Sequence, residues 1–140
     1  MEKIFYKEGY KYQLVEEYEV KTTIIREPSD KSVIMSDYIT LWASGLLLVE
    51  KGYAWDGPSG PTVDTKTFMR GSLVHDALYQ LMQLKLLDLR WRPFVDQELF
   101  RLCIEDGMTL IRAWYVWNAV KHFGEDHALP LGRKEILEAP

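Results

Sequence analysis

The chain has 140 residues, of which 47% are hydrophobic and 27% are charged, and this composition excludes a disordered or fibrous protein. The length suits a single domain, residues 1–140, that can bury a sizeable core. With 17 Lys and Arg against 21 Asp and Glu, the net charge of -4 disfavours long nucleic acid as a partner, because phosphate neutralisation dominates that affinity.

Residues 1–56 have the pattern of β-strands. The segment EYEVKTTII, residues 17–25, is rich in β-branched side chains and partly alternates between apolar and polar positions. Two apolar runs follow within residues 33–55, and Ser44-Gly45 separates them. We therefore expect three or four antiparallel strands, and then a loop rich in glycine and proline over residues 57–66.

Residues 67–124 have the pattern of helices. We expect three of them, over residues 68–87, 93–107 and 109–124, because a proline stands in the first turn of the second helix and a glycine ends each of the last two. Residues 125–140 resemble a loosely held tail. A strand block followed by a helix block predicts an α+β fold, with the helices packed on one face of an antiparallel sheet.

The third expected helix is apolar nearly all round, which is typical of a helix at the centre of a core. We therefore expect Trp114 and Trp117 to lie on the most buried helix. The alternative is that these tryptophans form a platform on which bases or sugars stack.

No window of the sequence approaches the ~20 apolar residues that a membrane-spanning helix needs, and the amino-terminal segment lacks the apolar region of a secretion signal. The expected location is the cytoplasm. The single cysteine, Cys103, falls at helical spacing with Leu99, so we expect a buried and inert thiol.

His75 lies at the edge between the apolar and polar faces of the first expected helix, one turn before Tyr79. A histidine in this position can be a metal ligand, a general base or a core imidazole held by hydrogen bonds. Asp76 is about 100° away around the helix. Joint use of His75 and Asp76 would therefore require a ligand or metal at the helix edge.

Asp96 shares the apolar stripe of the second expected helix with Leu99 and Cys103. A carboxylate on such a face is costly unless it is paired, hydrogen-bonded or bound to a metal. The structural alternatives are a first-turn acid stabilised by the helix dipole, or an ion pair with Arg92 one turn earlier.

The segment WDGPSGP, residues 55–61, places Asp56 and Ser59 in a stiff loop. Side chains of these types often bond only to backbone amides in such turns. Ser59 with His75 and a carboxylate would also suit nucleophilic hydrolysis, although the G-x-S-x-G pattern is missing.

Four motifs resemble those of domain-of-unknown-function family 1353, found in bacteria and their phages: GYAWDGPSGPTVDT, MRGSLVHDALYQL, RPFVDQELF and AVKHFG. The resemblance covers residues 52–124 and brings no established activity. The residues that match the family motifs are Asp56, Gly57 and Ser59 in the loop, His75, Asp76 and Tyr79 in the first helix, and Arg92, Asp96 and Phe100 in the second.

The first functional hypothesis is a phage or prophage hydrolase that uses a divalent metal to activate water and acts on a small phosphoester such as a nucleotide. In it, the metal is Mg²⁺, Mn²⁺ or Zn²⁺. The expected metal ligands are His75, Asp56, Asp76 and Asp96. The expected catalytic residues are His75, Asp56, Asp76 and Ser59. The expected substrate contacts are Tyr79, Trp55 and Arg92.

Two alternatives stay open. One is an amide or ester hydrolase that acts on cell-wall peptides through Ser59 and His75. The other is a non-catalytic phage accessory or virion component whose polar cluster ties the loop to the helices. If phage-encoded, the protein is expected in the host cytoplasm. A shared pocket predicts that the side chain of His75 lies within about 3 to 6 Å of Asp56 or Asp96.

Overall fold

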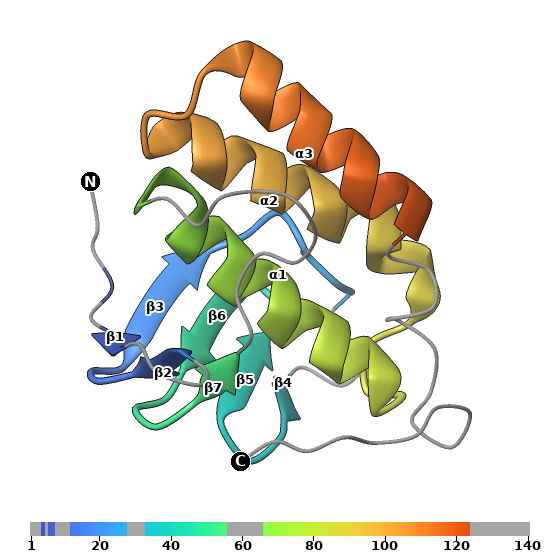
Figure 1. Ribbon diagram of the computed structural model, residues 1–140. Coiled ribbons are helices and arrows are strands. Elements are labelled where there is room, and N and C mark those ends of the chain that lie inside the picture. Colours follow the sequence, from blue (N-terminus) through green and yellow to red (C-terminus); the bar gives the residue numbers. More distant parts are fainter. Residues whose placement is uncertain (1–3, 5, 8–11, 28–32, 56–65, 124–140) are drawn as a thin grey trace.

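The computed structural model describes residue 4 and residues 6–7, 12–27, 33–55 and 66–123. Antiparallel strands fill the amino-terminal half, and three helices follow them (Figure 1). The α+β class expected from the sequence is confirmed. The expected tail, Asp56 and Ser59 lie outside the described residues. The expected loop also lies outside them, except for Lys66.

The larger sheet has four antiparallel strands in the order β3, β6, β5 and β4. Their bounds are Tyr18–Lys21, Leu46–Val49, Ile39–Trp42 and Val33–Met35. The tight turn between β5 and β6 contains Ser44 and Gly45, as expected. Gly45 has φ +96°, and a Cβ at this position would lie 2.4 Å from the carbonyl oxygen of Thr22, so only glycine fits.

A smaller sheet, which the sequence patterns did not predict, has the order β1, β2 and β7. The bounds of these strands are Tyr6–Lys7, Tyr12–Leu14 and Ala54–Trp55. Tyr12 pairs with Trp55 across the last two strands, and their ring centroids lie 5.6 Å apart. This sheet fixes the point at which the chain leaves the strand half.

The helices form layers on the sheet. α1 (Lys66–Gln83) packs on the larger sheet, α2 (Arg92–Glu105) packs on α1, and α3 (Leu110–Phe123) packs on α2 (Figure 1). A short 3-10 helix, η1 (Leu89–Trp91), precedes α2. The larger core cluster joins both sheets to α1 and part of α2, whereas a smaller cluster joins α2 to α3.

The most buried helix is α1, so the expectation that α3 would be most buried was wrong. Trp114 is 56% exposed, and Leu110, Ile111 and Tyr115 are also exposed. The reason is that α3 packs mainly on a single neighbour, for which a narrow stripe with Ala113 and Val116 is sufficient.

Gly71 lies on the face of α1 that contacts α2. A Cβ on Gly71 would lie 2.9 Å from Cδ1 of Leu99 and 3.3 Å from its carbonyl oxygen. The missing side chain thus allows the two helices to approach one turn away from His75.

Candidate functional site

His75 of α1 and Asp96 of α2 meet at this helix contact. Nε2 of His75 lies 2.8 Å from Oδ1 of Asp96, within the range that the shared-pocket hypothesis predicted. Both residues are buried, at 8% and 1% exposure. The contact is confirmed, and it explains how a carboxylate is tolerated on the apolar face of α2.

Tyr79 completes this cluster from the next turn of α1. Its hydroxyl donates a hydrogen bond to the same oxygen of Asp96 at 2.7 Å. Its ring stacks on the imidazole of His75 with 4.2 Å between the centroids. The imidazole is therefore held at one edge by a carboxylate and on one face by a phenol.

Asp76 lies on the opposite edge of the imidazole. Its Oδ1 is 3.9 Å from Nδ1 of His75, and its side chain is 36% exposed. The buried edge of the imidazole is thus bonded to Asp96, while the other edge faces a half-exposed carboxylate. The sequence spacing required a ligand or metal at the helix edge for joint use of His75 and Asp76, and Nδ1 of His75 and the carboxylate of Asp76 both lie at that edge.

The two carboxylates set the charge preference of His75. Burial by itself lowers the pKa of the imidazole, but the hydrogen bonds and negative charges of Asp76 and Asp96 together outweigh it. The pKa of His75 is therefore raised above its ordinary value of 6.5. A cation that binds Nδ1 must displace the proton that these carboxylates favour.

Tyr79 is a fixed donor in this cluster. Burial raises the pKa of its phenol first, and the negative charge of Asp96 raises it further, against a smaller opposing effect of Arg92. The phenol therefore stays protonated and serves Asp96. The expected role of Tyr79 as a substrate contact does not fit, because its side chain is buried and its hydroxyl is already bonded.

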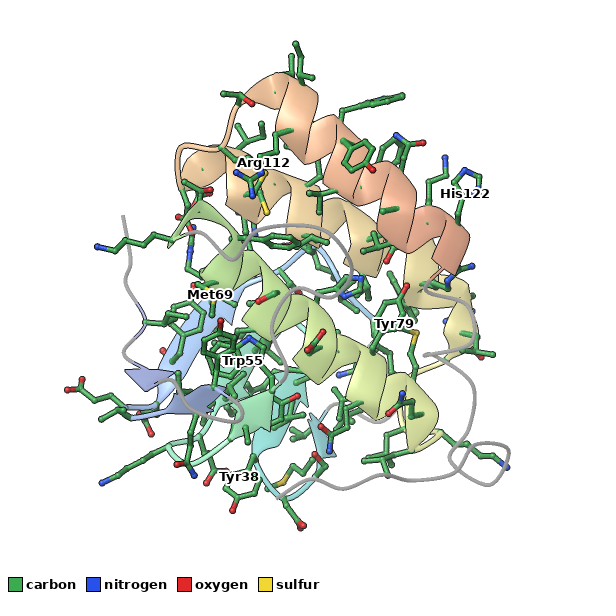
Figure 2. The ribbon with its side chains drawn as sticks, in the orientation of Figure 1. Tyr38, Trp55, Met69, Tyr79, Arg112 and His122 are labelled. Carbon is green, nitrogen blue, oxygen red and sulfur yellow. The ribbon has the colours of Figure 1, made fainter. Side chains whose placement is uncertain are left out.

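Trp55 does not fit its expected role as a substrate contact either. It lies beneath α1, next to Met69, and is only 2% exposed (Figure 2). Its indole nitrogen donates a hydrogen bond to Oγ of Ser72 at 3.1 Å. Burial of so large a ring against α1 makes Trp55 a core residue.

Arg92 was considered from the sequence as an ion-pair partner of Asp96, but its side chain is directed toward α3. Its Nη2 donates to the carbonyl oxygen of Lys121 at 2.7 Å, which ties the start of α2 to the end of α3. Arg92 also acts on the phenol of Tyr79. Its side chain is half-buried between these elements.

The described residues contain no group of three or more metal-ligating side chains. They provide two donors at the site, Nδ1 of His75 and the carboxylate of Asp76. Ligand atoms about 2.1 Å from one tetrahedral ion lie about 3.4 Å apart. A small rotation of the half-exposed Asp76 would close the 3.9 Å gap to this distance.

Two further buried charge clusters were not predicted from the sequence. Glu98 accepts hydrogen bonds from the backbone and hydroxyl of Thr23 and from Arg101. Arg70 is buried and bonds to Asp106, Glu105 and Tyr18. A charged residue within the apolar run FMRGSLV was the sequence signal for the Arg70 cluster.

Cys103 is fully buried against α1 in the smaller core cluster. Burial raises the pKa of its thiol to about 12. The expectation of a buried thiol is confirmed, and a thiol with this pKa is a poor nucleophile at neutral pH.

Comparison of the chain with family models, curated proteins and solved structures found no match. Within the described part of the chain, no helix has the length and apolar character needed to cross a membrane.

Proposed function

We propose that the chain is a metal-assisted hydrolase in which Nδ1 of His75 and the carboxylate of Asp76 hold a divalent cation. The observation that carries the proposal is the 2.8 Å bond between Nε2 of His75 and Asp96. A carboxylate on one imidazole nitrogen orients the ring and makes the other nitrogen a better ligand, which is the usual support of metal-binding histidines.

This proposal changes the expected role of Asp96. Its Oδ1 already accepts hydrogen bonds from His75 and Tyr79, and its carboxylate is buried. We therefore assign Asp96 to positioning His75 and no longer to direct ligation. The natural source of a third ligand is Asp56, which follows β7, and its place at the site is part of the proposal.

Oxygen-rich ligation with one imidazole suits Mg²⁺ or Mn²⁺ and also permits Zn²⁺. A cation of this kind supplies an activated water and polarises the bond to be hydrolysed. Around it, Asp96 holds the ring of His75 in place and is itself held by the hydroxyl of Tyr79. We propose a small phosphoester such as a nucleotide as substrate, because the net charge of -4 disfavours a long polyanion, and we place the enzyme in the cytoplasm.

Metal analysis of protein purified without chelators tests this function. We expect bound metal in the wild type, together with hydrolysis of bis-p-nitrophenyl phosphate in the presence of Mg²⁺, Mn²⁺ or Zn²⁺. His75→Ala and Asp76→Asn should lose both, and Asp96→Asn should bind metal about 10- to 100-fold more weakly. His122→Ala is the matched control, because His122 is exposed near the end of α3 (Figure 2).

A second candidate is a structural cluster without chemistry. Its supporting observation is that Asp96 bonds two buried side chains of α1 and so ties the two helices together. Asp76→Asn separates the candidates, because the bonds that tie α1 to α2 in this cluster run from His75 and Tyr79 to Asp96. Equal metal uptake by the wild type, Asp76→Asn and His75→Ala would contradict the hydrolase. The alternative with Ser59 as nucleophile stays a prediction, since Ser59 lies outside the described residues.

A further inference from the structure

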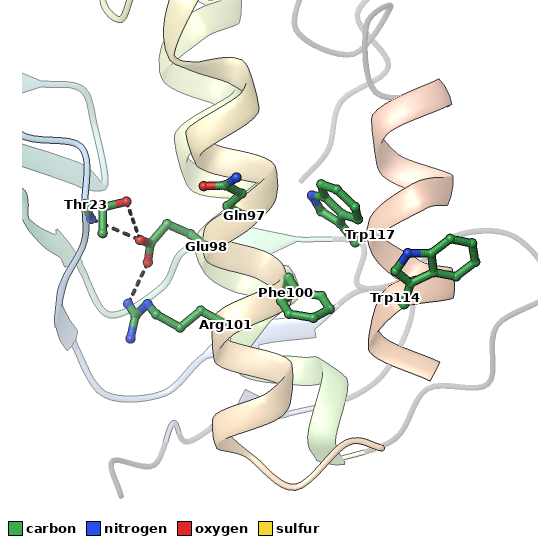
Figure 3. Close-up of a pocket in the computed structure, with 7 residues that line it drawn as sticks. All are labelled: Thr23, Gln97, Glu98, Phe100, Arg101, Trp114 and Trp117. Atoms are coloured by element: carbon green, nitrogen blue, oxygen red, sulfur yellow. Dashed lines mark hydrogen bonds and ion pairs between the residues drawn. The ribbon is translucent and has the colours of Figure 1, made fainter. Parts of the chain in front are cut away.

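A pocket lies between α2 and α3, away from His75 (Figure 3). Its volume of about 370 Å³ falls at the lower end of the range for small-molecule sites. Three aromatic rings line it, those of Phe100, Trp114 and Trp117. The polar lining residues are Thr23, Gln97, Glu98 and Arg101.

The three rings differ in how far neighbouring side chains hold them in place. Phe100 and Trp117 form an edge-to-face pair with centroids 6.1 Å apart, and the ammonium of Lys121 lies 4.5 Å from the ring centroid of Trp117. These two rings are therefore fixed by neighbours. Trp114 is 56% exposed and offers an open face, as the stacking alternative considered from the sequence requires.

The pocket wall contains hydrogen-bond donors without acceptors. Nε1 of Trp117 and Nε of Arg101 are buried, and neither has a hydrogen-bond partner among the residues that the structure describes. Figure 3 shows the nitrogen edge of the Trp117 indole turned toward α2 and Gln97. A buried donor without a partner costs about 1 to 3 kcal/mol. A ligand with acceptors placed at these two nitrogens would therefore gain binding free energy.

The charges at the pocket compensate one another. The carboxylate of Glu98 accepts from Thr23 and Arg101, and Arg101 also bonds Glu105. The guanidinium is thus neutralised by two carboxylates. The part of a ligand that enters the pocket should therefore be uncharged, flat and rich in acceptors.

We propose that this pocket binds a planar heteroaromatic ring with carbonyl or ring-nitrogen acceptors, of the kind found in nucleobases. The ring stacks on Trp114, and an acceptor on its edge receives the indole N–H of Trp117. The proposal is independent of the proposed hydrolase, since none of the pocket residues belongs to the cluster of His75, Asp76 and Asp96.

Titration with uridine and adenosine, which carry no phosphate, tests the pocket. The chain has five tryptophans, so each indole N–H can be followed separately by ¹H–¹⁵N NMR, and the Trp117 signal is assigned by its loss in Trp117→Phe. We expect at least one nucleoside to shift the Trp117 signal in a saturable way. A phenyl riboside, which keeps the flat ring and the sugar but lacks ring acceptors, should bind more weakly.

Three variants resolve the contributions. Trp114→Ala should weaken nucleoside binding about 5- to 150-fold, in line with the measured range for base stacking. Trp117→Phe keeps the ring and removes the donor, so we expect a loss of about 2- to 12-fold. Tyr115→Ala is the matched control, because Tyr115 is 59% exposed beside Trp114 and does not line the pocket.

The proposal is overturned if no nucleoside binds up to its solubility limit, or if the phenyl riboside binds as tightly as both nucleosides. An equal loss in Trp114→Ala and Tyr115→Ala would also overturn it. A sedimentation change in Trp114→Ala without nucleoside binding would instead identify this face as a contact between copies. Unchanged uridine binding by His75→Ala is expected, so this proposal and the hydrolase can fail separately.

Discussion

Arg70 and His75 lie little more than one turn apart on α1, and each bonds carboxylates at the neighbouring helix from a buried position. The guanidinium of Arg70 is satisfied by Asp106, Glu105 and Tyr18, and these bonds raise the pKa of Arg70 still higher despite its burial. It carries a permanent charge. His75 has one nitrogen bonded and the other facing a half-exposed carboxylate, and although burial lowers its pKa, the two carboxylates raise that pKa above its ordinary value.

The difference separates a structural cluster from a candidate site. Both clusters contain buried, paired charges, so burial and pairing alone do not indicate chemistry. The His75 cluster also has a group whose protonation can change and an edge that a ligand can reach. Four measurements, ordered from the largest expected effect to the smallest, can break or sharpen this comparison.

The largest effect is expected for Arg70→Ala. Removing the guanidinium leaves two carboxylates and a phenol without their shared donor, and loss of one member of a buried ion pair typically costs about 3 to 5 kcal/mol. Urea unfolding measures the loss. The control is Lys66→Ala, an exposed change at the start of α1 that should stay within about 0.5 kcal/mol. A loss from Arg70→Ala no larger than the control would show that the cluster is not a structural clamp.

Asp96→Asn should have a smaller effect, a loss of about 1 to 3 kcal/mol in the free energy of unfolding at neutral pH. The amide keeps the shape of the carboxylate and can still accept from Tyr79, but it removes the charge that favours protonated His75. Urea unfolding of both variants under one condition gives the comparison. A larger loss of unfolding free energy in Asp96→Asn than in Arg70→Ala would reverse the expected order of the two clusters.

Tyr79→Phe removes one hydrogen bond and keeps the stacked ring, so we expect a loss of about 1 kcal/mol. The carboxylate of Asp96 then keeps its bond to His75. The pKa of His75 should therefore rise further, which an NMR titration of the imidazole protons would detect. A fall in this pKa would mean that the phenol does not compete with His75 for Asp96.

The smallest effect concerns the pH dependence of stability, measured with a chelator present. The pKa of His75 is raised on folding, so its stabilisation is complete below about pH 6.5 and is lost as the pH rises through the folded-state pKa. Glu105 behaves oppositely, because the hydrogen bond from Arg70 lowers its pKa below 4.5 and its contribution is lost on the acid side. His75→Gln should remove only the dependence near neutral pH, and persistence of that dependence would contradict the assignment to His75.

The helices could be predicted from local signals. Pro93 and Gly107 mark the ends of α2 to within about two residues, which is the usual precision of helix boundaries. The small sheet could not be predicted in this way, because its strands have two or three residues and β2 pairs with β7 across a long stretch of chain. The exposure of Trp114 could not be predicted either, since an apolar pattern does not state how many neighbours a helix has.

The candidate site was predicted in part. Asp96 could be recognised because a carboxylate on an apolar helix face needs a partner, and the shared-pocket hypothesis offered His75 at the edge of the preceding helix. The opposite case is Glu98, which looked solvent-facing on its own helix but is buried by the segment after β3. The burial of Trp55 could not be predicted for a related reason, because it depends on both Tyr12 and α1.

The layered packing of the helices has a consequence for local unfolding. α3 belongs only to the smaller core cluster, whereas α1 lies in the larger one. Amide hydrogens of α3 should therefore exchange with solvent through a local opening that leaves the rest of the fold closed. Each opening would take the pocket apart by withdrawing Trp114 and Trp117, while the contact between His75 and Asp96 persists. The two candidate sites would thus be maintained on different timescales within one small domain.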